Sequence, residues 1–186
     1  MAAAKKNSTY LLAFSSVLCA VAVMLMFATG LFPFATYAIP AAAGAFLMAV
    51  YIEAGPKYAY MVFIGAAILS LFLCADKEAA VLFALFFGHY PVTKAYVERI
   101  RFTPLCWAVK IILFNLLVVA SYYIVFSLFM TPQLLEDFSD FGKYTAIILM
   151  GMGNLVFILY DVGLTRVVTL YVRVIGPKYI SKLLRK

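Results

Sequence analysis

Long apolar stretches separated by short breaks constrain this chain more than any other feature of its sequence. One membrane crossing needs about 20 apolar residues to span about 30 Å of hydrocarbon. Since 67% of the 186 residues are hydrophobic and only 12% are charged, the chain has room for five or six crossings and for no soluble domain. The apolar runs are continuous, whereas the strands of a membrane barrel alternate apolar and polar residues. The sequence therefore predicts an all-α, polytopic transmembrane helical bundle.

Pro, Gly and charged residues divide the apolar sequence into six predicted spans, which form one transmembrane domain over residues 1–164. The fourth span has an apolar core, 79–87, that is too short by itself. It crosses the membrane only if the helix continues through Pro91 with a kink, and a re-entrant segment is the alternative. The six spans are expected at about 9–29, 34–52, 58–75, 79–99, 105–130 and 144–164.

The distribution of basic residues predicts the orientation, because Lys and Arg are retained on the cytoplasmic side of a membrane. With the N-terminus inside, all 15 basic residues except Lys77 and Lys143 fall on cytoplasmic segments or their flanks. An even number of spans with both termini in the cytoplasm fits this pattern. We therefore expect a multi-pass protein of the cell membrane, of the kind found in the bacterial cytoplasmic membrane.

Residues 165–186 form a predicted basic cytoplasmic tail in which apolar residues alternate with six basic residues. This pattern is typical of an amphipathic helix that lies along anionic headgroups, and Gly176 and Pro177 divide it into two short pieces. The alternative is a docking surface for a cytoplasmic partner. The net charge of +7 is thus interpreted as attraction to the lipid bilayer and not to nucleic acid.

A few polar residues lie within the predicted spans, where an ionisable group costs at least a few kcal/mol and is a functional candidate. One interpretation is that Lys110 reaches the headgroups and Asp161 pairs with it or with Arg166 as a structural clamp. The other is that Asp161, Lys110 and His89 line a polar pocket or gate in the cytoplasmic half, with the histidine able to change charge near neutral pH. The candidate polar cluster consists of His89, Tyr90, Lys110, Asn115, Asn154 and Asp161.

Small residues recur every four positions in the second and fourth spans, which is the usual sign of close helix contact in lipid. Packing within the bundle explains such stripes, and docking onto a separate membrane subunit is the alternative. The stripes are Ala41, Ala45 and Ala49, and Ala80, Ala84 and Gly88.

Aromatic residues gather on the predicted outer side, where they would surround any cavity open to the exterior. An aromatic belt at the membrane interface explains them equally well. They are Tyr37, Tyr122, Tyr123, Phe138 and Phe141.

The motifs that mark common enzymes are missing from the sequence. Asp161 is the single acid away from the ends of the predicted spans, and His89 is the single histidine, without a Gly-x-Ser-x-Gly sequence to supply a nucleophile. The three cysteines lie far apart, and neither metal-ligand spacings nor nucleotide-binding loops occur. We therefore expect no enzymatic activity, no metal site and no cofactor.

The layout of the whole chain resembles the substrate-binding S components of bacterial energy-coupling factor transporters. The resemblance consists of the helix count, the termini, the basic tail and a loop from Phe32 to Pro40 that leads into a small-residue helix with Gly44. It implies a vitamin or similar small ligand on the outer side, and docking through alanine-rich helix surfaces onto a transmembrane transport module driven by ATPases. The first helix has only Ser16 and Ala20 at the spacing by which that family docks. The segment 87–94 is also similar to a pattern in uncharacterised Gram-positive membrane proteins, which implies no function.

Two hypotheses follow from the sequence. The first is a small-molecule-binding, transport-associated membrane subunit. The second is a non-transporting membrane scaffold or assembly factor that acts through its basic cytoplasmic face.

Overall fold

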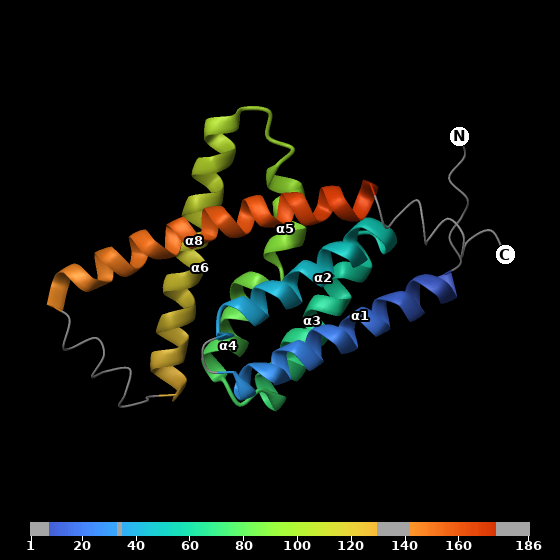
Figure 1. The fold of residues 1–186 in the computed structure, drawn as a ribbon, viewed down its shortest axis with the longest axis horizontal. Coiled ribbons are helices and arrows are strands. Elements are labelled where there is room, and N and C mark those ends of the chain that lie inside the picture. The colour runs from blue at the N-terminus through green and yellow to red at the C-terminus, as the bar shows by residue number, and fades with distance from the viewer. Residues whose placement is uncertain (1–7, 33–34, 130–141, 174–186) are drawn as a thin grey trace.

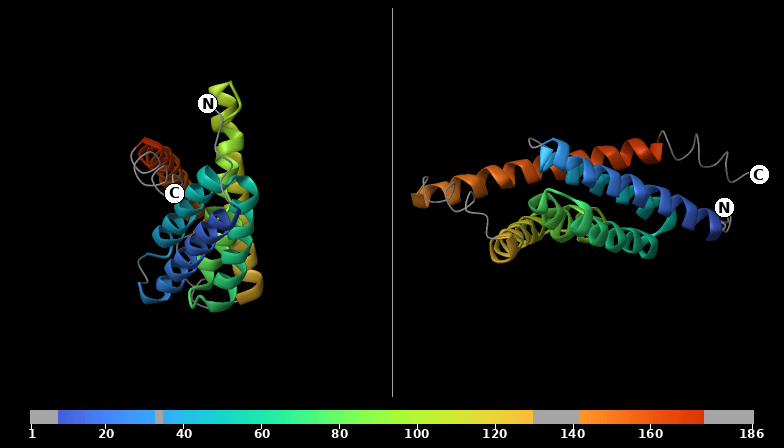
Figure 2. Two further views of the ribbon diagram at one scale, coloured as in Figure 1. Left: turned by 90° about the vertical axis from the view of Figure 1, so that its right-hand side faces the viewer. Right: turned by 90° about the horizontal axis from the view of Figure 1, so that it is seen from below.

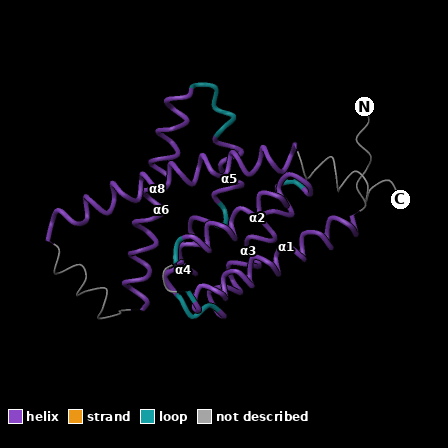
Figure 3. Tube along the Cα trace, in the orientation of Figure 1, coloured by secondary structure: helices purple, strands orange, loops and turns teal. Residues whose placement is uncertain are grey.

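The structure is a computed structural model that describes residues 8–32, 35–129 and 142–173. Within these ranges the regular structure is helical and no strand occurs (Figures 1 and 3). The elements are α1 (Ser8–Ala28), the 3-10 turn η1 (Thr29–Leu31), α2 (Ala38–Ala54), α3 (Pro56–Leu73), α4 (Lys77–Leu82), the π-helical turn η3 (Phe83–Phe87), α5 (Tyr90–Val97), α6 (Thr103–Phe129) and α8 (Gly142–Leu170).

Five helical segments of the described residues are long and apolar enough to cross a membrane. The helix α2, with 17 residues, is apolar but shorter. The described part of the chain is therefore all-helical, and its apolar helices have the length and composition of membrane spans in a multi-pass protein. The five segments are Ser8–Leu31, Pro56–Leu73, Lys77–Val97, Thr103–Val125 and Met150–Arg173.

The helices form two groups that share the turn η3. In Figure 1, α1, α2 and α3 lie together along similar axes and run alternately in opposite directions, while α5 and α6 form a hairpin that α8 crosses. Both views in Figure 2 place α8 on one side of the molecule and the α5–α6 hairpin on the other. The α1–α3 group has a core of small and medium apolar residues, including Ala22, Ala43, Leu47, Ala59 and Ala66.

The turn between α2 and α3 follows from two residues. Gly55 has a φ of 88°, a conformation that residues with a side chain rarely adopt, and its N–H donates to Tyr51 O. Pro56 then starts α3 in the first helical turn, where a missing N–H costs nothing. The chain therefore reverses between the second and third helices without a loop.

The fourth apolar segment continues past Pro91 to Val97, as a crossing requires, and it is interrupted before Pro91, at η3 and the turn at Gly88 and His89. Asp76 caps α4 by accepting from the N–H of Ala79 at 3.0 Å. The helix then widens into η3 and turns before α5 starts at Tyr90. Pro91 lies in the first turn of α5, so it begins a new helix and does not kink a continuous one, because a proline there removes no intrahelical hydrogen bond.

Close packing against this interruption requires glycine at two positions. A Cβ at Gly44 would lie 2.1 Å from Phe87 O, so the backbone of α2 touches the end of η3. A Cβ at Gly88 would lie 2.6 Å from the ring of Phe63 on α3. The turn η3 is thus held by α2 on one side and by α3 on the other.

The two predicted small-residue stripes lie inside the bundle. Ala80 and Gly88 are buried and Ala84 is half-buried. The other stripe, Ala41, Ala45 and Ala49, is half-buried beside the buried face of α2. It faces α8 at two points. Ala45 packs against the aromatic cluster between α6 and α8, and Tyr160 donates a hydrogen bond to Ala41 O at 3.5 Å.

The last helix extends beyond its predicted end at residue 164. The helix α8 runs as one piece to Leu170, and residues 171–173 continue as a π-helical turn. No break separates the span from the start of the predicted tail, because neither Gly nor Pro occurs between Leu164 and Arg173. Gly176, Pro177 and the basic residues after them lie outside the described residues.

Candidate binding site between helices α5, α6 and α8

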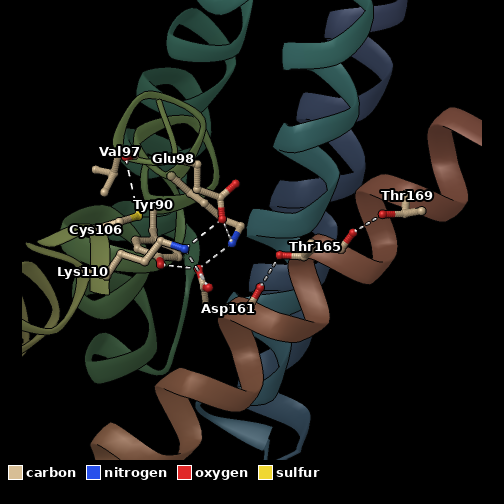
Figure 4. Close-up of polar contacts among 9 residues, drawn as sticks. Tyr90, Val97, Glu98, Cys106, Lys110, Asp161, Thr165 and Thr169 are labelled. Carbon is tan, nitrogen blue, oxygen red and sulfur yellow. Dashed lines mark hydrogen bonds and ion pairs between the residues drawn. The ribbon is translucent and has the colours of Figure 1, made fainter. Parts of the chain in front are cut away.

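The carboxylate of Asp161 lies at the centre of a polar site built from three helices (Figure 4). It is buried, with 2% of its surface exposed. Tyr90 Oη and Lys94 Nζ, both from α5, donate to Asp161 Oδ1 at 2.6 Å each. Lys110 Nζ, from α6, donates to Oδ2 at 2.8 Å. Each carboxylate oxygen therefore has at least one charged donor.

Glu98 completes a network of four charges. Its Oε1 accepts from Lys94 and, at 2.8 Å, from Lys110, so each ammonium group bridges two carboxylates. Lys94 and Lys110 are only 1% and 3% exposed, whereas the Glu98 side chain is 41% exposed. We call Lys94, Glu98, Lys110 and Asp161 the four-charge network. Its formal charges cancel, which is the condition under which buried charges are tolerated in a membrane.

The break before α5 explains why these side chains meet. Tyr90, Lys94 and Glu98 follow one another at intervals of four residues, so they lie on one face of the short helix and at its C-terminal end. The loop after Glu98 reverses the chain into α6, which brings Lys110 back beside that face. Asp161 reaches the same point from α8, where it crosses the hairpin.

The pKa of Glu98 is lowered from its ordinary value. Partial burial by itself favours the neutral acid, but the hydrogen bonds from Lys110 and Lys94 outweigh it. The carboxylate is therefore ionised near neutral pH, which the charge balance of the network requires.

A cavity of about 560 Å³ opens beside the network. This volume lies within the range of about 300–1,000 Å³ that is typical of small-molecule sites. The charged side chains at its wall are Glu98, Lys110, Asp161 and Arg166. The remaining lining residues are Ile100, Thr103, Cys106, Trp107, Val162, Thr165 and Thr169.

The α8 wall of the cavity presents hydroxyl groups whose hydrogens are already used. Thr165 donates to Asp161 O at 3.0 Å, and Thr169 donates to Thr165 O at 2.8 Å (Figure 4). Their oxygens can still accept a hydrogen bond from a ligand. On the opposite wall, which α6 forms, Lys110 Nζ lies 5.1 Å from the centroid of the Trp107 ring, a cation–π distance.

The sequence predicted some of these positions. It proposed that Tyr90, Lys110 and Asp161 lie close together, and the structure brings them together, including the Asp161–Lys110 ion pair. His89 points elsewhere. Its Nε2 is 2.5 Å from Leu85 O, and its ring contacts Phe63 edge to face at 5.8 Å. His89 is the residue before α5 starts, so it lies off the face that carries Tyr90.

The remaining two predicted polar residues pair with each other. Asn115 Nδ2 donates to Asn154 Oδ1 at 3.0 Å, and Asn154 Nδ2 donates back at 2.9 Å. Each amide also donates to the carbonyl four residues earlier in its own helix, at 2.8 Å. This pair ties α6 to α8 separately from the four-charge network.

Lys94 and Glu98 were missed by the reasoning from sequence. Lys94 was interpreted only as a cytoplasmic flanking charge, and Glu98 was given no role. The spacing of Tyr90, Lys94 and Glu98 is the signal that was available, because it predicts a shared helix face. Arg166, an expected alternative partner of Asp161, instead lies at the cavity wall.

A second polar cluster lies at the other end of the α4–α5 segment. Tyr37 and Tyr122 donate to Glu78 Oε1 at 2.8 and 3.1 Å, and their hydroxyl oxygens are 2.9 Å apart. Tyr123 is exposed and takes no part in this cluster. Phe138 and Phe141 lie outside the described residues. The cluster links the start of α2, the start of α4 and the late part of α6.

Among the described residues, no group of three or more His, Cys, Asp or Glu side chains is arranged to hold a metal ion. Comparisons with protein-family models, with curated proteins and with solved structures find no match for this chain. The interpretation of the site therefore depends on its geometry alone.

Proposed function

We propose that this protein crosses the cell membrane six times, with both termini in the cytoplasm. In Figure 1, α1, α2 and α3 run alternately in opposite directions and α5 and α6 form an antiparallel hairpin, which supports this topology. The 17 residues of α2 rise about 25 Å, close to the thickness of a bilayer core, so α2 can serve as the sixth span. Arg99 and Arg101, in the α5–α6 loop, then lie on the cytoplasmic side.

Cysteine labelling tests this topology. In a variant without the three native cysteines, Arg101→Cys should react with an impermeant maleimide only after the cells are opened. Ala75→Cys, between α3 and α4, should react in intact cells. Labelling of both positions from the same side would contradict the proposal.

We propose that the protein is a binding subunit that holds the polar group of a small molecule in the cavity between the α5–α6 loop, α6 and α8. The single observation that carries this function is a cavity of about 560 Å³ whose wall includes buried, fully paired charges next to an exposed arginine. A structural clamp by itself requires no cavity beside it. The resemblance to S components implies association with a transmembrane transport module and ATPases, and we propose this association for the subunit. The same resemblance implies a ligand on the outer side, whereas this cavity lies at the α5–α6 loop, on the cytoplasmic side of the proposed topology.

Thermal stabilisation by a panel of vitamins, nucleobases, amino acids and phosphorylated metabolites tests the binding function. A ligand at about 100 times its dissociation constant stabilises a protein by about 2.7 kcal/mol. Val162→Trp should fill the cavity and abolish the stabilisation. Val167→Trp is the matched control, because the two valines share α8 and are 45% and 48% exposed, but only Val162 lines the cavity. Equal loss in both variants would contradict binding in the cavity.

The scaffold function is a second candidate, and the α5–α6 loop favours it. Arg99 stacks over the Tyr96 ring at 4.9 Å, and Arg101 and Phe102 are exposed beside it. Such a basic and aromatic surface suits a cytoplasmic partner or the membrane interface. Deleting residues 174–186 and replacing Arg99 and Arg101 by Gln should then abolish recruitment of the partner while insertion stays intact. Unchanged recruitment would count against this function.

A further inference from the structure

One positive charge at the cavity wall, Arg166, lies outside the neutral four-charge network. The four-charge network contributes two positive and two negative charges, and Arg166 adds one more positive charge at the wall. Within the described part of the chain, no carboxylate lies within ion-pair distance of Arg166, so its guanidinium is free to bind a ligand. The cavity is therefore suited to an anion.

We infer that the cavity binds the phosphate group of an anionic phospholipid, with Arg166 as its main ligand and Glu98 as an internal competitor. This inference depends on the proposed binding function and names the class of molecule that the cavity takes. A guanidinium presents its N–H groups in a planar fork that matches two phosphate oxygens, which makes arginine the preferred residue for such groups.

The surroundings of the cavity favour a lipid over a soluble phosphate. The cavity lies between α6 and α8, whose outward faces near it carry exposed apolar residues, among them Leu105 and Leu170. In a bilayer, these faces are covered by acyl chains. Trp107 lines the cavity near the start of α6, a position typical of an indole at the headgroup level. Basic pockets between spans on the cytoplasmic side are a common location for anionic headgroups.

Glu98 already occupies an anion position in this site. Its Oε1 accepts from both buried ammonium groups, and its side chain is the exposed member of the network. Glu98 and Lys110 both line the cavity, so a phosphate that binds there meets Lys110 beside Glu98. The lipid and the Glu98 carboxylate therefore compete for the same donor.

This competition predicts changes of opposite sign in two variants. Arg166→Gln should weaken binding of phosphatidylglycerol by roughly ten-fold, because a charge-assisted contact to phosphate is lost. Glu98→Gln should strengthen it several-fold, since the competing charge is removed while both lysines stay. A network with a purely structural role gives no reason for Glu98→Gln to tighten lipid binding.

The experiment measures lipid binding by native mass spectrometry and by thermal shift of the full-length protein in neutral detergent. Phosphatidylglycerol and phosphatidylcholine with identical acyl chains are the lipid probes, and inorganic phosphate and glycerol phosphate are the soluble probes. Arg173→Gln is the matched control, because Arg173 lies in the π-helical turn that continues α8, is exposed like Arg166 and does not line the cavity. Arg166 is exposed, so its replacement should leave the fold intact.

The expected result is preferential binding of phosphatidylglycerol that Arg166→Gln weakens, Arg173→Gln spares and Glu98→Gln strengthens. Equal losses in the two arginine variants would overturn the inference, because general attraction to the lipid would explain the binding. Soluble phosphates that bind in an Arg166-dependent way, without a preference for lipid, would overturn the lipid assignment but leave the binding function intact. If none of these probes binds, the inference fails, whereas the binding function fails only if the broader panel of small molecules also gives no stabilisation.

Discussion

The two groups of helices in this protein are held together by different means. In the α1–α3 group, the buried contacts are between small apolar residues such as Ala22, Ala43, Ala59 and Ala66, each fully buried. Around α8, the ties to other helices are instead polar and aromatic: the four-charge network, the Asn115–Asn154 pair and a cluster of stacked rings. Lipid provides no hydrophobic force between helices, so the two groups show the two available solutions, close packing and hydrogen bonding.

This difference indicates which parts of the structure tolerate amino-acid substitutions. Close packing is distributed over many small contacts, so most single changes in α1–α3 remove little. The attachment of α8 depends on a few polar groups, because the outward face of this helix is exposed along its length. A binding site is more readily formed around α8, because a cavity lies there beside side chains that already carry charge.

The largest effect is expected from Asp161→Asn. The change leaves Lys94 and Lys110 with Glu98 as their single counter-charge, and breaking a buried ion pair on one side costs about 3–5 kcal/mol. Lys110→Met should cost a similar amount. The double variant keeps the neutral Lys94–Glu98 pair, so it should lose less than the sum of the two single variants. Denaturant or thermal unfolding of the purified protein in nanodiscs measures all three.

Strictly additive losses in this cycle would show that Asp161 and Lys110 act independently. The polar attachment of α8 would then be weaker than the geometry indicates. His89→Gln is a suitable control, because His89 lies outside the network and should not couple to Asp161.

The next largest loss of stability is expected from Gly44→Ala, a change in the close-packed α1–α3 group. The added methyl group would lie 2.1 Å from the backbone oxygen of Phe87, so α2 and η3 must separate. Overpacking of this kind costs about 1–3 kcal/mol. Gly151→Ala in α8 is the control, because a Cβ there meets nothing within 4 Å. Equal stability of the two variants, measured by thermal unfolding, would contradict the close approach.

The sequence predicted the class of fold and part of the site. Continuous apolar runs identify membrane helices, and charges within them are rare enough that Lys110 and Asp161 were expected to meet. The sequence did not predict that Lys94 and Glu98 belong to the site. A charged residue near the end of a span gives the same sequence pattern whether its side chain faces the headgroups or a buried partner. The rotation of α5, which decides this, is set by the π-helical turn before it, and periodicity does not reveal that turn.

The Asn115–Asn154 pair should contribute less than the charged network. Asn115→Leu removes the two interhelical hydrogen bonds at 2.9 and 3.0 Å and leaves Asn154 bonded only to Met150 O. Interhelical hydrogen bonds in membranes contribute about 0.6 kcal/mol on average and about 1.7 kcal/mol at most, so a loss in this range is expected. Unfolding of Asn115→Leu and Asn115→Leu/Asn154→Leu measures it. A loss as large as that of Asp161→Asn would show that the amide pair, and not the charges, holds α8.

The smallest expected effect is a pH dependence from Glu98. Its folded-state pKa lies below the ordinary value of 4.5, because the hydrogen bonds from Lys110 and Lys94 outweigh its partial burial. A carboxylate with a lowered pKa stabilises the folded state fully above its ordinary pKa, and this stabilisation is lost as the pH falls through the lowered folded-state pKa. The wild-type melting temperature should therefore be insensitive to Glu98 between pH 7 and about pH 5.5 and decrease below about pH 4.5.

Other carboxylates titrate in the same range, so the contribution of Glu98 is the difference between the wild type and Glu98→Gln across the pH series. The difference should be largest near neutral pH and close to zero in acid, where the wild-type side chain is neutral as well. A constant difference at all pH values would mean that Glu98 contributes through its shape and not its charge. The two lysines would then be balanced by Asp161 alone. The ion pairs that attach α8, and that distinguish its packing from the packing of the α1–α3 group, would then involve one carboxylate instead of two.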